Sequence, residues 1–253
     1  MEITSPAGNF EKGKIAFIYG AHSVYVGYPN FSLRSGAEKF NFEELQKLID
    51  YANHLEKKVF LAINIFAHNK HIKQFKEELL KIKELSPHGL ILSDPGLILM
   101  AKEALPDMHI TLSTQANTTN YQTIKLWEKI GINRVVLARE LSLKEIAQIR
   151  ENTLLELEIF VHGAVCMAYS GRCFLSGFMT EPKLNMTHTA LSSPRVRHAN
   201  LGDCIQPCRF KFALIEENRK DIAFPIWEDA FGTYLLSAKD LCLINRLKEL
   251  KEA

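Results

Sequence analysis

The first 161 residues of this 253-residue chain alternate short apolar runs with amphipathic stretches, and this alternation most constrains the fold. Apolar runs predict strands, whereas apolar residues spaced three or four positions apart predict helices. Strands are expected near Ile3 and over Ser23–Tyr28, Lys58–Phe66, Gly89–Ser93, His109–Ser113, Arg134–Ala138 and Leu155–Val161. Helices are expected over Phe10–Tyr19, Phe42–Leu55, His71–Leu85, Gly96–Ala104, Tyr121–Ile130 and Leu143–Glu151.

About seven β/α alternations of this kind predict an α/β fold with a parallel sheet, because each helix returns the chain to the same edge. The predicted strands are nearly continuous apolar runs, as is typical of strands buried on both faces. Seven or more such units favour a TIM-like β/α barrel over an open sheet. We therefore expect residues 1–163 to form the barrel portion, with residues 164–253 in the same domain.

The alternation stops after Cys173. Residues 180–200 are polar and predict a surface loop. Two later segments, Lys211–Glu216 and Ile222–Trp227, could pair as an antiparallel hairpin across a polar turn. Ser237–Leu250 has helical spacing, with Asp240 early and lysines at its end, and predicts the final helix.

The amino terminus and the overall charge bear on location and partners. The first residues lack the basic and apolar regions of a secretory signal. No apolar run approaches the roughly 18 residues that span a bilayer. We therefore expect a cytoplasmic protein with no membrane contact. The net charge of +2, from 31 basic and 29 acidic residues, does not point to nucleic acid, although local basic patches could.

Four of the five cysteines form two pairs, Cys166 with Cys173 and Cys204 with Cys208. Clustered thiols in a reducing compartment indicate a metal site or a catalytic site more than disulfides. Core packing is disfavoured because Gly, Ser or Pro stands close to most of them. Their spacing leaves structural zinc and an iron–sulfur cluster equally open, since four thiolates bind either. Cys242 lies in an apolar pattern and is expected to be a buried small residue, or else a replacement ligand.

Polar residues stand at or just after the predicted strand ends, where barrels of this kind place their chemistry. They are Asn9, Asn64, Gln115, Asn117, Arg139, Glu140 and His162. Each could instead cap a helix or form a turn. We expect that simpler role for Asp94, and for Ser142 with Glu145 three positions later.

One stretch resembles the signature of the collagenase-like peptidase family, number thirty-two among the peptidases of unknown type. It reads Glu158-x-Phe160-x-x-Gly163-Ala-x-Cys166-x-x-Tyr169-Ser-Gly-Arg-Cys173-x-Leu-Ser176. Further matches are Ser5-Pro-Ala-Gly-Asn9, Phe31-Ser-Leu-Arg34, Ser113-Thr-Gln115-Ala-Asn117, Arg139-Glu-Leu-Ser142, Gln206-Pro-Cys-Arg209 and Ser237-Ala-Lys-Asp-Leu-Cys242. Together they cover nearly the whole chain.

The resemblance implies two kinds of activity. Many members are labelled proteases or collagenases, whereas better-understood relatives are hydroxylation factors for a tRNA uridine, an rRNA cytidine or ubiquinone precursors. This chain is most similar to the prephenate-dependent tRNA uridine hydroxylase branch. In such relatives, cysteines that match Cys166, Cys173, Cys204 and Cys208 are associated with a 4Fe–4S cluster. The resemblance thus implies iron–sulfur-dependent hydroxylation of tRNA, with prephenate as a candidate cosubstrate.

This interpretation assigns roles to the remaining polar residues. The candidate catalytic residues are His162, Tyr169, Arg139 and Glu140. The candidate substrate-binding residues are Asn9, Arg34, Asn64, Gln115, Asn117, Arg172 and Arg209. Guanidinium groups suit carboxylates and phosphates, and a Tyr or His could stack on a base or move a proton.

Two other functions stay open. A peptidase is one, although neither a His-Glu-x-x-His nor a Gly-x-Ser-x-Gly motif is present. A non-catalytic subunit or RNA-binding scaffold is the other, with a basic stripe of Arg195, Arg197, His198 and Arg209.

The chain departs from the family pattern in two places. Its 30 residues between Cys173 and Cys204 are about twice the usual number, although a longer loop costs little entropy. Relatives continue beyond the position of Ala253 into another strand. We therefore expect a barrel that is incomplete or irregular at its C-terminal end, which a protein partner or a second copy could complete.

Overall fold

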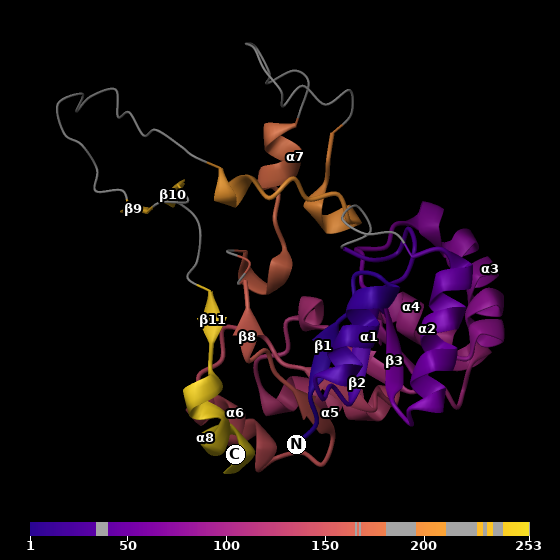
Figure 1. Ribbon diagram of the computed structural model, residues 1–253, viewed down its shortest axis with the longest axis horizontal. Helices are drawn as coiled ribbons and strands as arrows, with labels where there is room; N and C mark the ends of the chain where they lie inside the picture. The colour runs from indigo at the N-terminus through magenta and orange to yellow at the C-terminus, as the bar shows by residue number, and fades with distance from the viewer. Residues whose placement is uncertain are drawn as a thin grey trace.

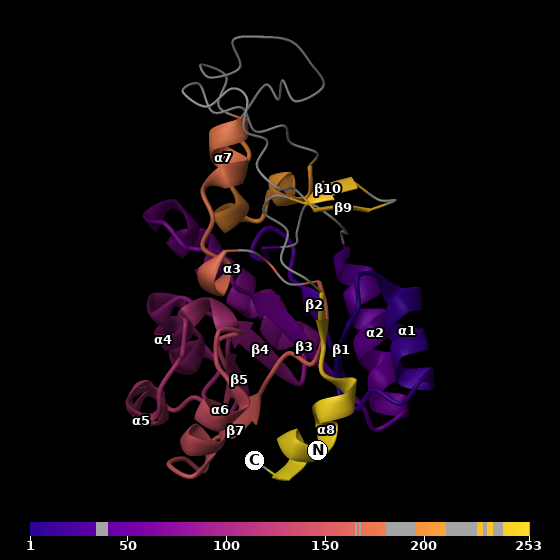
Figure 2. The ribbon, with the colours of Figure 1, turned by 90° about the vertical axis from the view of Figure 1, so that its left-hand side faces the viewer.

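The computed structural model describes residues 1–33, 40–164, 166, 168–180, 196–210, 227–229, 232–234 and 240–252. A curled sheet of seven parallel strands lies at its centre, with helices on its outer face (Figures 1 and 2). The strands are β1 (Thr4–Pro6), β2 (Ser23–Gly27), β3 (Lys58–Ile63), β4 (Gly89–Leu92), β5 (Ile110–Leu112), β6 (Arg134–Val136) and β7 (Glu156–Glu158). The helices are α1 (Phe10–Ile18), α2 (Phe42–His54), α3 (Asn69–Leu85), α4 (Pro95–Ala104), α5 (Tyr121–Ile130) and α6 (Leu143–Arg150).

The strands pair in sequence order from β1 to β7, each parallel to the next. The predicted α/β fold is therefore confirmed. Within the described part of the chain, β1 and β7 are the two edges of the sheet and do not pair with each other. The fold is an incomplete TIM-like barrel, as predicted.

The two faces of the sheet differ because successive side chains of a strand point to opposite sides. On β3, Val59, Leu61 and Ile63 belong to the main hydrophobic core with the helices. Phe60 and Ala62 point the other way and pack with Ile91 in a small inner cluster.

Side-chain caps begin several of the helices, as expected from the sequence. The Asp94 carboxylate accepts a hydrogen bond from the Leu97 N–H at the start of α4. Ser142 and Glu145 form a capping box at the start of α6. Both predicted caps are confirmed, and each contributes about 1 kcal/mol to the stability of its helix.

The inner face carries an ion-pair cluster that the apolar strand patterns did not predict. Arg134 on β6 is buried, and its Nη2 lies 2.7 Å from Glu156 Oε2 on β7. Its Nη1 lies 3.4 Å from Glu158 Oε2. The guanidinium also lies over the Phe60 ring, 5.1 Å from the centroid, and Nη2 is 3.9 Å from Glu2 Oε2 near β1. The cluster thus links the two edge regions of the curled sheet.

Burial and the Arg134 charge act in opposite directions on the two carboxylates. Burial raises the pKa of Glu158 above its ordinary value, although Arg134 partly opposes this. Burial also disfavours the charge of Glu156, but the hydrogen bond and charge of Arg134, together with the charges of His109 and Lys58, outweigh burial and hold that pKa low. Burial and the Arg134 charge lower the pKa of the neighbouring His109.

The last part of the chain corrects two predictions. Leu241–Cys242 form a short strand, β11, that pairs antiparallel with β8 (His162–Gly163). Within the described residues 240–252, a 3-10 turn at Ile244–Arg246 leads into the α-helix α8 (Leu247–Glu252), so the helix predicted over Ser237–Leu250 is wrong at residues 240–243. Backbone pairing with β8, extended by the hydrogen bond from Leu243 N–H to the Val161 carbonyl, overrides the local helical pattern. Cys242 is exposed, and its predicted burial is also wrong.

The predicted hairpin falls largely outside the described residues. Of its two segments, only Trp227 is described, and it begins β9 (Trp227–Asp229). This strand pairs antiparallel with β10 (Gly232–Tyr234) instead. No helix in the described ranges is long and apolar enough to cross a membrane.

Replacing Arg134 with methionine should destabilise the protein by about 3 kcal/mol at neutral pH, because Glu158 would stay buried without its counter-charge. Without Arg134 the pKa of Glu158 should rise further. When the pKa of Glu158 is higher in the folded than in the unfolded protein, the fold is most stable at low pH, where Glu158 is protonated. This stability is lost as the pH rises through the folded-state pKa. The deficit relative to the parent protein should therefore be larger at pH 8 than at pH 5 in urea unfolding.

The exposed pair of Lys47 and Glu43 provides the control, since Lys47→Met removes a cation whose partner is fully solvated. That variant should unfold like the parent. An Arg134→Met deficit that is absent, or that grows as pH falls, would contradict this account of the cluster.

Candidate functional site

The two cysteine pairs lie on loops above the end of the sheet at which the strands terminate. Figures 1 and 2 show residues 168–180, which include α7 (Leu175–Met179), and residues 196–210 at that end. Cys166 and Cys173 lie on the segment that follows β8. Cys204 precedes the 3-10 turn Pro207–Arg209, and Cys208 lies within it. This end of a β/α barrel is where active sites are found.

The four thiols are close enough to influence one another electrostatically. Burial raises the pKa of Cys208, the negative charges of Cys166, Cys204 and Cys173 raise it further, and Arg209 opposes them. Three of the thiols are half-buried and Cys204 is exposed. Among the described residues, no three His, Cys, Asp or Glu side chains are already grouped as metal ligands.

Backbone geometry near Cys204 suits a thiolate. Gln206 N–H donates a hydrogen bond to Cys204 Sγ at 3.3 Å. Gln206 reaches this position through a left-handed conformation, with φ of 56°. Hydrogen bonds of this kind stabilise thiolates and tune the potential of iron–sulfur clusters.

Ser170 anchors the first cysteine loop to the ends of β5 and β6. It is fully buried and left-handed, with φ of 46°. Its N–H donates to Glu140 Oε1 at 2.8 Å, and its hydroxyl donates to Asn117 Oδ1 at 2.8 Å. Glu140 and Asn117, both predicted as site residues, thus hold the loop between Cys166 and Cys173 in place.

Asn200 ties the two cysteine pairs to each other and to the loop after β3. Its carbonyl accepts a hydrogen bond from Phe66 N–H at 3.1 Å. Its side-chain Oδ1 accepts another from Cys173 N–H at 3.0 Å. Ser176 adds a further link, because its buried hydroxyl donates to the Arg197 carbonyl and accepts from Ile205 N–H.

Two predicted substrate-binding residues have structural partners. Asn9 caps α1 by accepting a hydrogen bond from Lys12 N–H at 2.9 Å. Asn64 accepts one from Leu33 N–H at 3.0 Å and so holds the loop after β2. Arg34 lies outside the described residues.

Other predicted residues keep polar atoms available. Gln115 is buried, and its Oε1 has no hydrogen-bond partner within the described residues. Tyr169 is 59% exposed. His162 is exposed and lies opposite Cys242 in the β8–β11 pair, so the fifth cysteine also comes near the start of the cysteine loop.

Arg139 presents an unused guanidinium edge. Its Nε and Nη2 atoms are buried and lack partners among the described residues. The guanidinium stacks on Phe160, 5.8 Å from the ring centroid. Nε and Nη2 lie on the same side of the guanidinium, the side that binds a carboxylate through two parallel hydrogen bonds.

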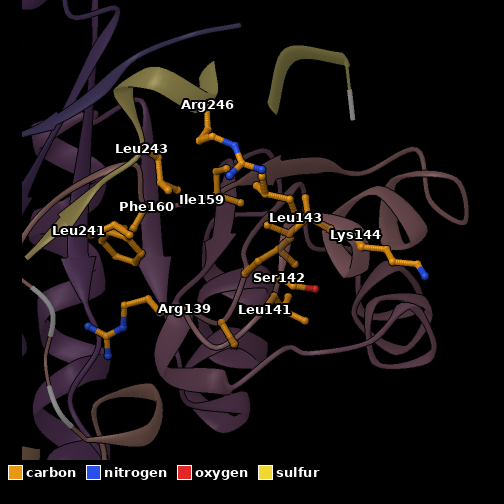
Figure 3. A pocket seen from close by; sticks show the side chains of 13 residues that line it. Arg139, Leu141, Ser142, Leu143, Lys144, Ile159, Phe160, Leu241, Leu243 and Arg246 are labelled. Carbon is orange, nitrogen blue, oxygen red and sulfur yellow. The ribbon is translucent and has the colours of Figure 1, made fainter. Parts of the chain in front are cut away.

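A pocket of about 480 Å³ lies beside Arg139. Its walls come from the segment between β6 and α6, from the residues after β7, and from the chain around β11. Figure 3 shows that the Arg139 guanidinium points away from Leu143 and Leu243 of the apolar lining. Arg246, also in the lining, is paired with Glu249.

The predicted basic stripe is not seen as a free surface. Arg197 forms an ion pair with Asp203 at 2.7 Å, and Arg209 lies 3.8 Å from Asp240. Arg195 lies outside the described ranges. Arg172 is exposed, with its guanidinium 5.7 Å from the centroid of the Phe66 ring.

Ser170, Asn200 and Ser176 are the residues that sequence reasoning missed. Ser170 and Ser176 stand in the family signature, and Tyr169-Ser-Gly-Arg172 is a turn-forming sequence between two cysteines, but neither serine was given a role. Their partners lie between 21 and 134 residues away in sequence, so no local pattern could reveal these contacts.

Replacing Ser170 with alanine should loosen the first cysteine loop by about 1 kcal/mol, because the Asn117 side chain loses its buried partner. The open population should rise roughly fivefold. We expect faster alkylation of Cys166 and Cys173 in reduced, metal-free protein, measured by mass spectrometry.

Ser86→Ala is the matched control, since Ser86 is also left-handed but is exposed, and its hydroxyl donates to the carbonyl of Lys83 in the preceding turn. It should leave thiol alkylation unchanged. Equal alkylation rates in Ser170→Ala and the parent protein would show that the Ser170 hydroxyl does not anchor the loop.

Comparisons with known proteins give consistent results. A family model described as Peptidase family U32 matches residues 8–253. The tRNA hydroxylation protein P of Escherichia coli is 37% identical, with 98% of this chain and 60% of that protein covered. The protein of the same name from Haemophilus influenzae is 43% identical, covering 87% and 45%. This chain thus spans about half the length of these relatives.

A solved structure of a U32 peptidase has the same fold. The TM-score is 0.56 at 14% identity, and the alignment covers 65% of this chain and 70% of that one. At this identity the likeness concerns the fold alone.

Proposed function

We propose that this chain, which belongs to peptidase family U32, takes part in RNA hydroxylation at a metal centre held by Cys166, Cys173, Cys204 and Cys208. One observation carries the proposal: both cysteine pairs are docked on the C-terminal end of the sheet by Ser170 and Asn200. The names of the two relatives support hydroxylation over proteolysis.

We further propose that the substrate is a uridine of tRNA. Both relatives are named for tRNA hydroxylation, and the Escherichia coli protein matches nearly all of this chain. A tRNA substrate would place the protein in the cytoplasm.

The donor set fits an iron–sulfur cluster in kind. Four cysteine thiolates are the usual ligands of a 4Fe–4S cluster, and zinc is the alternative for the same set. When bound, the cluster would supply single electrons to the reaction. The Gln206 N–H at Cys204 Sγ would help to set the potential. Cluster binding would release protons from the thiols, including that of Cys208, because burial raises the pKa of this thiol.

Arg139 and Gln115 would orient the reactants. The free Nε–Nη2 edge of Arg139 suits a carboxylate, and an anionic cosubstrate such as prephenate carries one. The unpartnered Gln115 Oε1 can accept a hydrogen bond from an N–H of a base. Tyr169 and His162 are exposed and remain our candidates for stacking on the base or moving a proton.

The open edges of the sheet suit completion of the barrel. Both β1 and β7 end the sheet in the described part of the chain, and unpaired strand edges readily accept another strand. We propose that a protein partner or a second copy provides it.

A thiol peptidase is the second candidate function. The observation that favours it is the exposed Cys242 lying opposite the exposed His162, since a cysteine nucleophile needs a nearby base. Gelatin cleavage by purified protein that is lost in Cys242→Ala, with RNA hydroxylation absent, would favour this function over ours.

Replacing Arg139 with methionine should raise the concentration of anionic cosubstrate needed for hydroxylation roughly tenfold or more, because a charge-assisted contact is lost. Arg246→Met is the matched control, because Arg246 lines the same pocket but is already paired with Glu249. Unchanged cosubstrate dependence in Arg139→Met would contradict the assigned role.

The function itself can be tested in cells that lack their own tRNA hydroxylation protein. Expression of this chain should restore a hydroxylated uridine, detected by mass spectrometry of tRNA nucleosides, and Cys166→Ser should abolish it. Normal hydroxylation by Cys166→Ser would contradict the proposed metal centre. If neither the parent chain nor Cys166→Ser restores the hydroxylated uridine, the proposed function of the chain is contradicted.

A further inference from the structure

Three large aromatic side chains next to Cys173 are exposed rather than buried. Phe174 is 80% exposed, Phe178 is 60% exposed and Tyr169 is 59% exposed. Aromatic side chains usually gain stability by burying most of their area, so three exposed within ten residues need a reason. All three belong to the segment that carries the first cysteine pair.

The fold holds two of these rings outward on one side of α7. Phe178 N–H donates to the Phe174 carbonyl at 2.9 Å, so the two residues stand one helical turn apart on the same side. The opposite side is packed, because Ser176 and Gly177 are buried. A Cβ at Gly177 would come within 2.9 Å of His198 Nδ1, which leaves no room for α7 to rotate its rings inward.

The segment that carries these rings is basic in sequence, which favours a polyanion. Residues 166–210 contain five basic and two acidic residues, whereas the whole chain is nearly balanced. Among the described residues of this segment, Arg197 is paired with Asp203 and Arg209 lies 3.8 Å from Asp240, whereas Arg172 is placed beside an aromatic ring. Arg172 belongs to this segment, is exposed, and has its guanidinium over the ring of Phe66 on the loop after β3.

We propose that Phe174 and Phe178 form a stacking platform for unpaired bases of single-stranded RNA, beside the cysteine pairs. The inference rests on the proposed function and adds how the substrate is recognised. Exposed aromatic rings with arginines nearby are typical of surfaces that bind single strands, because each base offers a flat face. A duplex keeps its bases stacked on one another, so the platform should discriminate against it.

The test is equilibrium binding of a short fluorescent single-stranded RNA and of its duplex, measured by anisotropy. Phe174→Ala and Phe178→Ala should each weaken single-strand binding about tenfold. Phe174→Leu should weaken it similarly, because it keeps an apolar side chain but loses the ring, whereas Phe174→Trp should retain binding. Tyr19→Ala is the control, since Tyr19 is 88% exposed and follows α1 at the other end of the sheet.

Three results would overturn the platform. They are equal affinity for single strand and duplex, full binding by Phe174→Leu, or loss of self-association with unchanged RNA affinity in the alanine variants. The last would make the rings a contact between protein copies. The binding assay does not depend on hydroxylation. If the chain binds RNA through the rings but hydroxylates no RNA, the platform is supported and the proposed function is refuted. If the chain hydroxylates RNA and Phe174→Ala binds RNA as well as the parent does, the proposed function is supported and the platform is refuted.

Discussion

The hydrogen bond from Ser170 N–H to Glu140 Oε1 is the interaction on which the candidate site depends. Ser170 is left-handed, a conformation that costs a residue with a side chain roughly 1–2 kcal/mol. A hydrogen bond to a carboxylate contributes about 1.5–3 kcal/mol, and the second bond to Asn117 adds to it. The contacts therefore outweigh the strain, and the loop between Cys166 and Cys173 is fixed on the ends of β5 and β6.

The rest of the site is built outward from that anchor. Asn200 connects the Cys173 backbone to the loop after β3, and Ser176 connects α7 to the segment that carries Cys204. The inner face of the sheet carries a different kind of cluster, in which Arg134 binds Glu156 and Glu158. The scaffold thus separates a charged cluster inside the curled sheet from the thiols on the loops above its C-terminal end.

Much of the scaffold could be predicted because its elements are set by local patterns. The helix over Tyr121–Ile130 follows directly from 3.6-residue spacing, and the caps at Asp94 and Ser142 from their side chains. The failures have a common cause in long-range contacts. Residues 241–242 form a strand because β8 offers backbone partners, and Arg134 is buried because Glu156 and Glu158 on the neighbouring strand pair with it. For the same reason, the cysteine pairs could be recognised in the sequence but the residues that hold them could not.

Metal analysis of anaerobically purified protein tests the central claim, that four particular thiols form one site, most directly. We predict about four irons and four sulfides per chain. This content should be lost in Cys166→Ser, Cys173→Ser, Cys204→Ser and Cys208→Ser, and kept in Cys242→Ser. Loss of the metal in Cys242→Ser, with retention in any of the other four, would show that the ligand set is different. One zinc without sulfide would contradict the iron–sulfur centre itself.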